Sequence, residues 1–277
     1  MPELAAAIAQ NVTAALAEDI GKGDLTVGLI PPDKHFSANI ICRENAVLCG
    51  IAWAEACFYR LDASSRITWL ASDGDDIHPD QLICTIHGNA RAMLTAERAA
   101  LNFLQTLSAT ATQARRYADA IRGTRAVVMD TRKTLPGLRL AQKYAVRTGG
   151  GANQRTGLFD GILIKENHIA AAGGIRQALT VAASLNAGVP IQIEVESMDE
   201  LQTALDAGAS LILLDNFDLS LLKEAVRISS GRATLEASGG ISLDTIRAVA
   251  ETGVDRISVG SLTKDVRAID LSMRFEP

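Results

Sequence analysis

The sequence predicts an α/β protein in two parts, a small domain of strands and helices followed by a domain of repeated strand–helix units. In the first third, short strands that alternate apolar and polar residues are mixed with helices. From about residue 125 onward, short runs rich in Val, Ile and Leu alternate with helical stretches, which is typical of a parallel sheet covered by helices. Glu194, Asp215 and Glu236 lie at or near the ends of three runs, at a constant spacing of 21 residues, and such equal units favour a barrel.

The first predicted domain covers residues 1–112. Leu4, Ile8, Val12 and Leu16 recur every four residues and predict an amphipathic helix over 4–19. A loop with several glycines and acids follows at 18–26, and the strongest helical pattern spans 90–107. Strands are expected at 36–42, 47–49, 67–70 and 82–86, and a helix at 51–61. The four cysteines all lie in this part without a Cys-x-x-Cys pair, so free thiols in a reduced core are expected.

The second predicted domain covers residues 113–266 and contains the parallel sheet. Its strands are expected at 126–129, 162–164, 191–195, 211–214, 233–235 and 256–259. A single acid after a strand most often caps the next helix. Three acids in phase at the carboxyl ends of the strands, facing one basic cluster, instead indicate a site on that rim.

The composition excludes several classes of protein. Of 277 residues, 48% are hydrophobic and 21% charged, which excludes a disordered chain. The 27 basic and 32 acidic residues give a net charge of −5, and 4% of residues are aromatic, which argues against nucleic-acid binding. No apolar run approaches the ~18 residues of a membrane span, and a basic signal-peptide start is absent. We therefore expect a cytoplasmic protein without a membrane partner.

A basic segment indicates an anionic substrate. Residues 131–165 hold seven Lys or Arg residues and one acid, although the whole chain is negative. Such segregation of charge usually serves an anion. Arg132 and Lys133 follow one predicted strand and Lys165 follows another, so they are expected on the same rim as the acids. Arg139, Lys143 and Arg147 lie on one helix face, where we expect them to be solvated.

Two glycine loops near the end of the chain predict a phosphate site. Ser238-Gly239-Gly240 and the segment from Ser258 to Gly260 each follow a strand and precede a helix. Glycines let backbone N–H groups approach phosphate oxygens, and the loops after the last strands of a barrel commonly hold a phosphate. A phosphorylated sugar that reacts through a cationic carbon suits this set, because carboxylates stabilise that cation and Mg²⁺ holds a pyrophosphate leaving group.

Six motifs, which run nearly from end to end, resemble those of the quinolinate phosphoribosyltransferase family. They lie at residues 18–24 (EDIGKGD), 97–105 (ERAALNFLQ), 130–147 (DTRKTLPGLR and QKYAVR), 163–169 (LIKENHI), 214–216 (LDN) and 236–241 (EASGGI). The resemblance implies an N-terminal α/β sandwich domain and an incomplete seven-stranded α/β barrel, with residues 267–277 returning to the first domain. It also implies the Mg²⁺-dependent reaction of quinolinate with phosphoribosyl pyrophosphate to nicotinate mononucleotide, pyrophosphate and CO₂, a step of de novo NAD biosynthesis.

The resemblance also assigns roles to individual residues. Quinolinate and the phosphoribosyl donor are expected to bind a set of anion-binding and phosphate-binding residues: Arg132, Lys133, Gln154, Arg155, Lys165, Ser238, Gly239, Gly240, Ser258 and Gly260. Lys133, Glu194 and Asp215 are expected to be catalytic, and the two acids are also expected to contact substrate and hold the metal. Arg98, which periodicity alone places on a solvated helix face, is expected to enter the neighbouring subunit's site, so the active unit is a homodimer.

The family usually has Asn-His-Arg where this chain has Asn153-Gln154-Arg155. Glutamine keeps an N–H donor but has no positive form, so a related phosphoribosyltransferase of the molybdenum-transport-associated branch, with another acceptor, remains an alternative. Two further hypotheses come from other classes. Lys165 would serve a Schiff-base aldolase, and the phosphate loops would serve a non-enzymatic regulator that binds a phosphometabolite.

Overall fold

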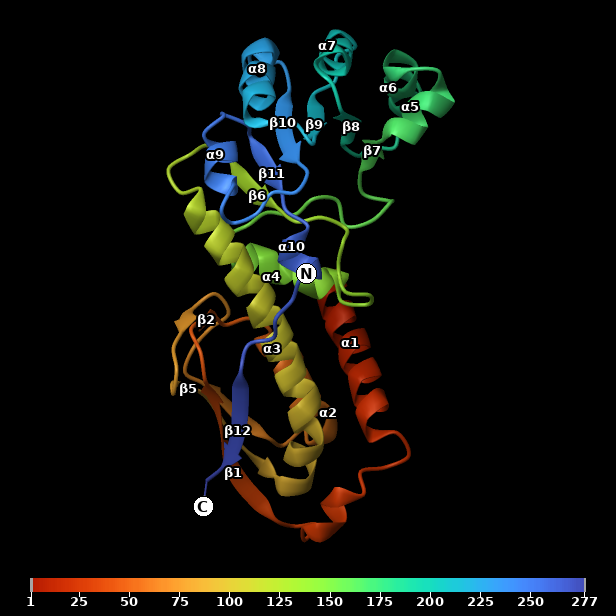
Figure 1. Cartoon of the computed structure of the whole chain (residues 1–277). Coiled ribbons are helices and arrows are strands. Elements are labelled where there is room, and N and C mark those ends of the chain that lie inside the picture. The colour runs from red at the N-terminus through yellow and green to blue at the C-terminus, as the bar shows by residue number, and fades with distance from the viewer. Residues whose placement is uncertain (1, 277) are drawn as a thin grey trace. The chain divides into compact units, whose positions relative to one another are not determined.

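The computed structural model describes residues 2–276, which divide into two compact units (Figure 1). Unit 1 contains the chain up to residue 115, residues 134–150, and the chain from residue 265 on. Unit 2 contains residues 116–133 and 151–264. The sequence prediction assigned residues 134–150 to the second domain, whereas the contacts group them with unit 1.

Unit 1 combines an antiparallel sheet with helices. Its helices are α1 (Pro2–Ile20), η1 (Thr26–Leu29), α2 (Ile51–Leu61), most of α3 (Ala90–Ala120) and α4 (Arg139–Thr148). Its strands are β1 (His35–Cys42), β2 (Ala46–Val47), β3 (Arg66–Trp69), β4 (Asp76–Ile77), β5 (Leu82–Asn89) and β12 (Leu271–Phe275). The four-stranded sheet has the order β12-β1-β5-β3, and β2 pairs with β4. The C-terminal strand therefore completes the sheet of unit 1, pairing antiparallel with β1 from Ala38–Phe275 to Cys42–Leu271.

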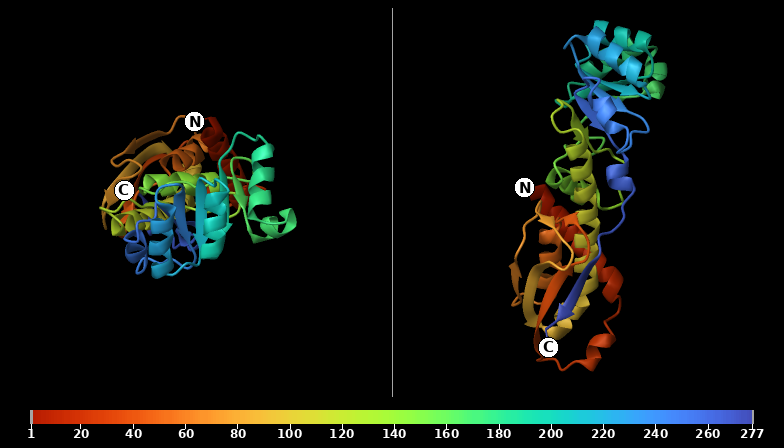
Figure 2. Two further views of the ribbon diagram at one scale, coloured as in Figure 1. Left: turned by 90° about the horizontal axis from the view of Figure 1, so that it is seen from above. Right: turned by 60° about the vertical axis from the view of Figure 1, so that its left-hand side comes forward.

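Alternation along β1 and periodicity along α3 build the core of unit 1. Ala38, Ile40 and Cys42 are fully buried on one face of β1, as their period of two predicts. Residues of α3 such as Met93 and Leu104 belong to the same core cluster, and the helix lies along this sheet (Figure 2). All four cysteines are buried and free, as the sequence predicts.

Helix α4 corrects one expectation. Ala141 and Ala145 join the core cluster of unit 1. Lys143 is 3% exposed and has interaction partners, whereas we expected it to be solvated. The remaining two basic residues of the helix agree better with that expectation, because Arg147 is exposed and Arg139 half-buried.

Unit 2 is a parallel sheet of strand–helix units. Its strands are β6 (Val127–Met129), β7 (Ile162–Ile164), β8 (Ile191–Val195), β9 (Leu211–Asp215), β10 (Thr234–Ser238) and β11 (Arg256–Ser258). The helices are α5 (Glu166–Ala172), α6 (Ile175–Ser184), α7 (Met198–Asp206), α8 (Leu219–Ser229), α9 (Ile246–Ala250) and α10 (Ser261–Lys264). Strand order is β6-β11-β10-β9-β8-β7, so each strand from β8 to β11 lies beside the previous one in the chain.

The sheet of unit 2 is not closed within the described part of the chain. Six strands form it, and the seventh that the family resemblance implied is reduced to an isolated parallel bridge between Met129 and Ala152. Strands β7 and β6 are the two ends of the sheet order. This arrangement agrees with an incomplete barrel, in which the edge strand β7 lacks a second neighbour.

The strand register separates the three acids that sequence spacing put in phase. Glu194 and Glu236 both pair with Leu213, from opposite sides of β9. Asp215 pairs instead with Ser238, two residues further along the strands. Because side chains two residues apart point to the same face, all three acids share a face, but Asp215 lies closer to the rim.

Among residues 2–276, no helix combines the length and apolar character needed to span a membrane.

Candidate active site

The carboxyl ends of the strands in unit 2 surround a cavity of about 340 Å³. Its walls are formed by twelve residues, namely Thr131, Arg132, Lys133, Gln154, Arg155, Leu163, Lys165, Glu194, Leu213, Glu236, Ser238 and Ser258. Eight of them were predicted from the sequence as site residues. Ligand sites at the carboxyl ends of parallel strands are the rule for this architecture.

Four cations line this one cavity, which was the central expectation from the sequence. Arg132 and Lys133 come from the turn after β6, Arg155 from the loop before β7, and Lys165 from the residue after β7. Burial, reinforced by the positive charge of Arg132, lowers the pKa of Arg155. A guanidinium in this position stays charged, so an anion between the two arginines would relieve their repulsion.

Backbone and carboxylate contacts hold two of the cations in place. Arg155 donates from Nη1 to the carbonyl of Gly161 at 2.9 Å. Lys165 forms a salt bridge of 2.9 Å with Glu194, whose side chain is 12% exposed while that of Lys165 is 48% exposed. Glu194 therefore occupies the Lys165 nitrogen, which a Schiff-base aldolase would need to leave open to a carbonyl substrate.

The buried carboxylate of Glu236 forms part of the cavity wall, and sequence spacing placed this residue on the rim without giving it an individual role. Glu236 lies in the middle of β10 and has no exposed surface. Gln154 donates to both of its oxygens, at 2.5 and 2.6 Å, and Gln192 donates at 3.0 Å. Ser258 also donates to Glu236. The constant spacing of Glu194, Asp215 and Glu236 was the signal for this residue, but its neutral partners were not predictable from spacing.

Asp130 fixes the loop that carries Gln154 and Arg155. It is fully buried and accepts from the Gln154 backbone at 2.8 Å and from the Asn153 side chain at 2.6 Å. Because Asp130 follows β6 directly, these bonds tie the loop to the same strand end that carries Arg132 and Lys133.

An acidic cluster on the rim offers ligands for a hard cation. Oxygens of Glu194, Glu196 and Asp215 lie within 4.8 Å of one another. The negative charge of Glu166, followed by desolvation and the charges of Glu200, Asp215 and Glu194, raises the pKa of Glu196. A divalent cation would offset this repulsion, and carboxylate oxygens are the ligands that Mg²⁺ prefers. Sequence reasoning selected Glu194 and Asp215 but missed Glu196, which lies in the loop between β8 and α7.

The predicted phosphate loop lies beside the cavity. Ser238 lines the cavity, and it also lines a neighbouring one of about 400 Å³ together with Gly239, Gly240, Asp218 and Asp244. A Cβ atom at Gly239, where φ is +109°, would lie 2.1 Å from Oδ1 of Asn216, so this turn requires glycine.

The remaining predicted residues lie outside the cavity wall. Gly260 lies close to Lys133, because a Cβ atom there would be 3.3 Å from the lysine Cδ. Asp215 belongs to the acidic cluster rather than the wall. Arg98 belongs to α3 in unit 1, where it is exposed while Ala99 and Ala100 are buried.

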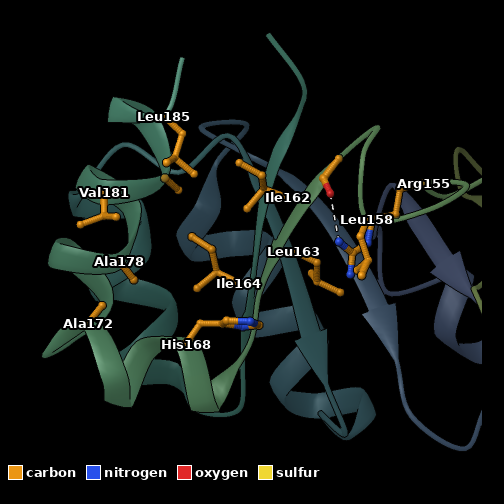
Figure 3. Close-up of a pocket in the computed structure, with 12 residues that line it drawn as sticks. Arg155, Leu158, Ile162, Leu163, Ile164, His168, Ala172, Ala178, Val181 and Leu185 are labelled. Carbon is orange, nitrogen blue, oxygen red and sulfur yellow. Dashed lines mark hydrogen bonds between the residues drawn. The ribbon is translucent and has the colours of Figure 1, made fainter. Parts of the chain in front are cut away.

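A second cavity of about 310 Å³ lies on the other side of Arg155, against the edge strand β7. Ile162 and Ile164 point toward Ala178 and Val181 of α6, and Arg155 lies at the opposite side (Figure 3). Apart from Arg155 and His168, its lining is apolar or glycine. The cationic cavity therefore matches an anionic substrate better.

Comparisons with known proteins agree with this geometry. A family model described as the C-terminal domain of quinolinate phosphoribosyl transferase matches residues 110–274, and the corresponding N-terminal domain matches residues 24–108. The chain is 41% identical to a probable nicotinate-nucleotide pyrophosphorylase [carboxylating] of Bacillus subtilis, over 92% of this chain and 89% of that protein. It is 40% identical to a mitochondrial quinolinate phosphoribosyltransferase [decarboxylating] of Nicotiana tabacum, over 95% and 80%.

Solved structures share the whole fold. The structure of the nicotinate-nucleotide pyrophosphorylase from Francisella tularensis superposes with a TM-score of 0.95 at 46% identity, covering 98% of this chain and 96% of that chain. A structure from Streptococcus pyogenes has a TM-score of 0.93 at 36% identity, covering 98% and 97%. The two family models match parts of both units, and the relatives cover at least 92% of this chain. The chain belongs to the quinolinate phosphoribosyltransferase family.

Proposed function

We propose that this chain transfers the phosphoribosyl group of phosphoribosyl pyrophosphate to quinolinate and releases CO₂, which yields nicotinate mononucleotide and pyrophosphate for NAD biosynthesis. The observation that carries the proposal is the convergence of Arg132, Lys133, Arg155 and Lys165 on one cavity. Both substrates are polyanions, and the names of the relatives describe this reaction in those proteins.

The acceptor suits the arginine side of the cavity. Quinolinate carries two adjacent carboxylates, and guanidinium groups bind carboxylates through paired hydrogen bonds. After burial, the positive charge of Arg132 is the second cause of the lowered pKa of Arg155. The two guanidinium groups are therefore close enough to act on the same ligand. In the proposed mechanism they hold the acceptor so that its ring nitrogen faces the sugar.

Bond changes then follow in two steps. The lone pair of the ring nitrogen forms the bond to C1 of the ribose while the C1–O bond to pyrophosphate breaks, and the electron pair leaves with pyrophosphate. The bond between the ring and the carboxylate next to the cationic ring nitrogen then breaks and CO₂ leaves. A proton from solvent takes the place of that carboxylate on the ring. Lys133 neutralises charge on the departing group, and Glu194 and Asp215 stabilise the positive sugar carbon.

Mg²⁺ fits the acidic cluster, where Glu194, Glu196 and Asp215 would hold it together with oxygens of the donor. When bound, it would add positive charge beside the pyrophosphate. The loop of Ser238, Gly239 and Gly240 would receive the 5′-phosphate of the donor through its backbone N–H groups.

We further propose a homodimer in which each subunit gives Arg98 to the site of its partner. Arg98 is exposed on α3, directly before the buried Ala99 and Ala100, so its charge can reach a second copy. Mixing Arg98→Ala subunits with Arg155→Ala subunits tests this arrangement. Random pairing should restore about a quarter of wild-type activity, because half of the dimers then hold one native site. Mixtures that stay as inactive as their components would contradict a shared site.

The reaction itself is tested by incubating the purified chain with both substrates and Mg²⁺ and separating the nucleotides by chromatography. We expect nicotinate mononucleotide, formed only when quinolinate, phosphoribosyl pyrophosphate and the metal are all present. A competition between quinolinate and nicotinate tests the alternative acceptor, to which Gln154 points. If another pyridine is consumed and quinolinate is not, the chain has the activity of the alternative branch. If neither substrate binds, the proposal fails.

A further inference from the structure

The side chain of Gln154 is held by the cavity wall. Its Nε2 donates to the two oxygens of Glu236 at 2.5 and 2.6 Å and to Oε1 of Gln192 at 3.1 Å. Its Oε1 accepts from the backbone N–H of Arg155 at 3.3 Å. Both ends of the amide are therefore engaged, one by a buried acid and the other by the residue that follows it.

The acid in this arrangement is joined to three separate segments of unit 2. Glu236 lies on β10, and its donors lie in the loop before β7, on β8 and on β11. Gln192 and Ser258 are 7% and 8% exposed. A buried carboxylate requires such donors, and a network whose members are all bonded fixes one arrangement of its side chains.

The donors to Glu236 are uncharged, whereas the rest of the wall carries the four cations. A carboxylate of the acceptor that approached Glu236 would meet another carboxylate, and one that approached Arg132 and Arg155 would meet opposite charge. The wall thus favours a single orientation, with the acidic edge of the acceptor toward the arginines and an uncharged edge toward Glu236.

We propose that Glu236 and Gln154 are a positioning pair for the acceptor, an inference that rests on the proposed function. Glu236 orients the amide of Gln154, the amide oxygen orients the peptide of Arg155, and the carboxylate keeps acidic groups away from that part of the wall. The pair acts on the aromatic dicarboxylate and leaves the phosphoribosyl donor alone.

Steady-state kinetics of Glu236→Gln, Gln154→Ala and the double variant test the pair. Each single variant should lower kcat/KM for quinolinate about tenfold, and the KM for phosphoribosyl pyrophosphate should change less than twofold. The double variant should be no worse than the poorer single variant, because the two residues act as one unit. Glu224→Gln, which alters an exposed glutamate of α8 paired with Arg227, is the matched control and should match wild type. Additive losses, or equal losses for both substrates, would overturn the proposal.

A second variant keeps the proposal testable if Glu236→Gln does not fold. The imidazole in Gln154→His would face Glu236, while the peptide of residue 154 stays bonded to Asp130. The other charged groups that line the same cavity are Arg132, Lys133, Arg155, Lys165 and Glu194. The protonated ring would attract the acceptor, so kcat/KM for quinolinate should rise as pH falls through the imidazole pKa. Wild type should lack this step.

The step in Gln154→His reports the contact with Glu236 directly. Adding Glu236→Asp, which keeps the charge but shortens the side chain, should move the midpoint of the step to lower pH, because the carboxylate no longer reaches the ring. An unmoved midpoint, or a pH profile identical to that of wild type, would overturn the pairing. Wild-type turnover of quinolinate is measured in the same experiment, so failure of the pair is distinguishable from failure of the proposed function.

Discussion

At the amino end of the sheet in unit 2, Asp255 binds Arg125 at 2.5 Å through one carboxylate oxygen and accepts from the backbone of Leu235 at 2.8 Å through the other. At the carboxyl end, Glu236 is bonded to neutral side chains and lies in the wall of a cavity with four cations. Both acids connect different segments of unit 2. The acid at the amino end is paired with a cation of the same chain, whereas the acid at the carboxyl end has neutral donors and shares its cavity with four cations. The amino end of the sheet therefore contributes to stability and the carboxyl end to ligand binding, as expected for parallel strands connected by helices.

The largest expected effect is the difference in activity between removing an arginine at the carboxyl end of the sheet and removing one at its amino end. Arg155→Ala should lower kcat/KM for quinolinate roughly 10²- to 10³-fold, because it removes a partly buried cation from an anion site. Arg125→Ala at the amino end should leave kcat/KM within about twofold of wild type. Steady-state kinetics of both variants measures the difference in kcat/KM, and thermal unfolding shows whether both are folded. Similar losses of activity in the two variants would contradict the assignment of binding to the carboxyl end.

The acidic cluster should control the metal requirement. Asp215→Ala should raise the Mg²⁺ concentration for half-maximal activity roughly tenfold or more, since one of three clustered carboxylates is lost. Asp206→Asn changes an exposed acid at the far end of α7 and serves as the control. A titration of activity with Mg²⁺ gives both values. An unchanged requirement in Asp215→Ala would place the metal elsewhere.

The amino end should respond in stability rather than in turnover. Asp255→Ala should lower the free energy of unfolding by about 1–3 kcal/mol, because a backbone N–H and a guanidinium both lose their acceptor. Urea unfolding at pH 7 measures the loss, and kinetics of the folded fraction should stay within about twofold of wild type. A large fall in turnover with unchanged stability would reverse the roles of the two ends.

The smallest effect lies in unit 1 and depends on pH. Hydrogen bonds from the Ser64 side chain first, and from the Asn89 backbone next, lower the pKa of Asp62. The stabilisation is therefore present above the unfolded pKa of about 4 and is lost as pH falls through the lower folded value. Asp62→Asn should cost about 1 kcal/mol at pH 7. In urea unfolding at several pH values, this difference should shrink below about pH 4, and a constant difference would refute the assignment.

Elements with strong local patterns were predictable from the sequence. Strand β1 and helix α2 were predicted within a residue of their bounds. The prediction ended the long helix at residue 107, but α3 continues to Ala120. Its extension is supported by tertiary bonds, since the Ser108 hydroxyl both accepts from Cys49 N–H and donates to its carbonyl. Contacts of that kind have no periodic signature.

The charged part of the site was predictable, and its neutral part was not. Arg132, Lys133 and Lys165 follow strand ends, and strand ends of a parallel sheet share a rim. The contacts of Glu236 with Gln192 and Ser258 depend on the register between strands, which spacing along the chain does not determine. For the same reason, the equal spacing of the three acids did not reveal that Asp215 lies two residues beyond the other two in the strand register.

The central claim is that the cationic end of unit 2 couples phosphoribosyl transfer to loss of one carboxylate. Release of labelled CO₂ from quinolinate, labelled in the carboxyl group beside the ring nitrogen, tests it most directly. We predict one CO₂ for each nicotinate mononucleotide formed, only when phosphoribosyl pyrophosphate is present, and its loss in Arg155→Ala. CO₂ release without the donor, or nucleotide formation that retains the label, would contradict the account.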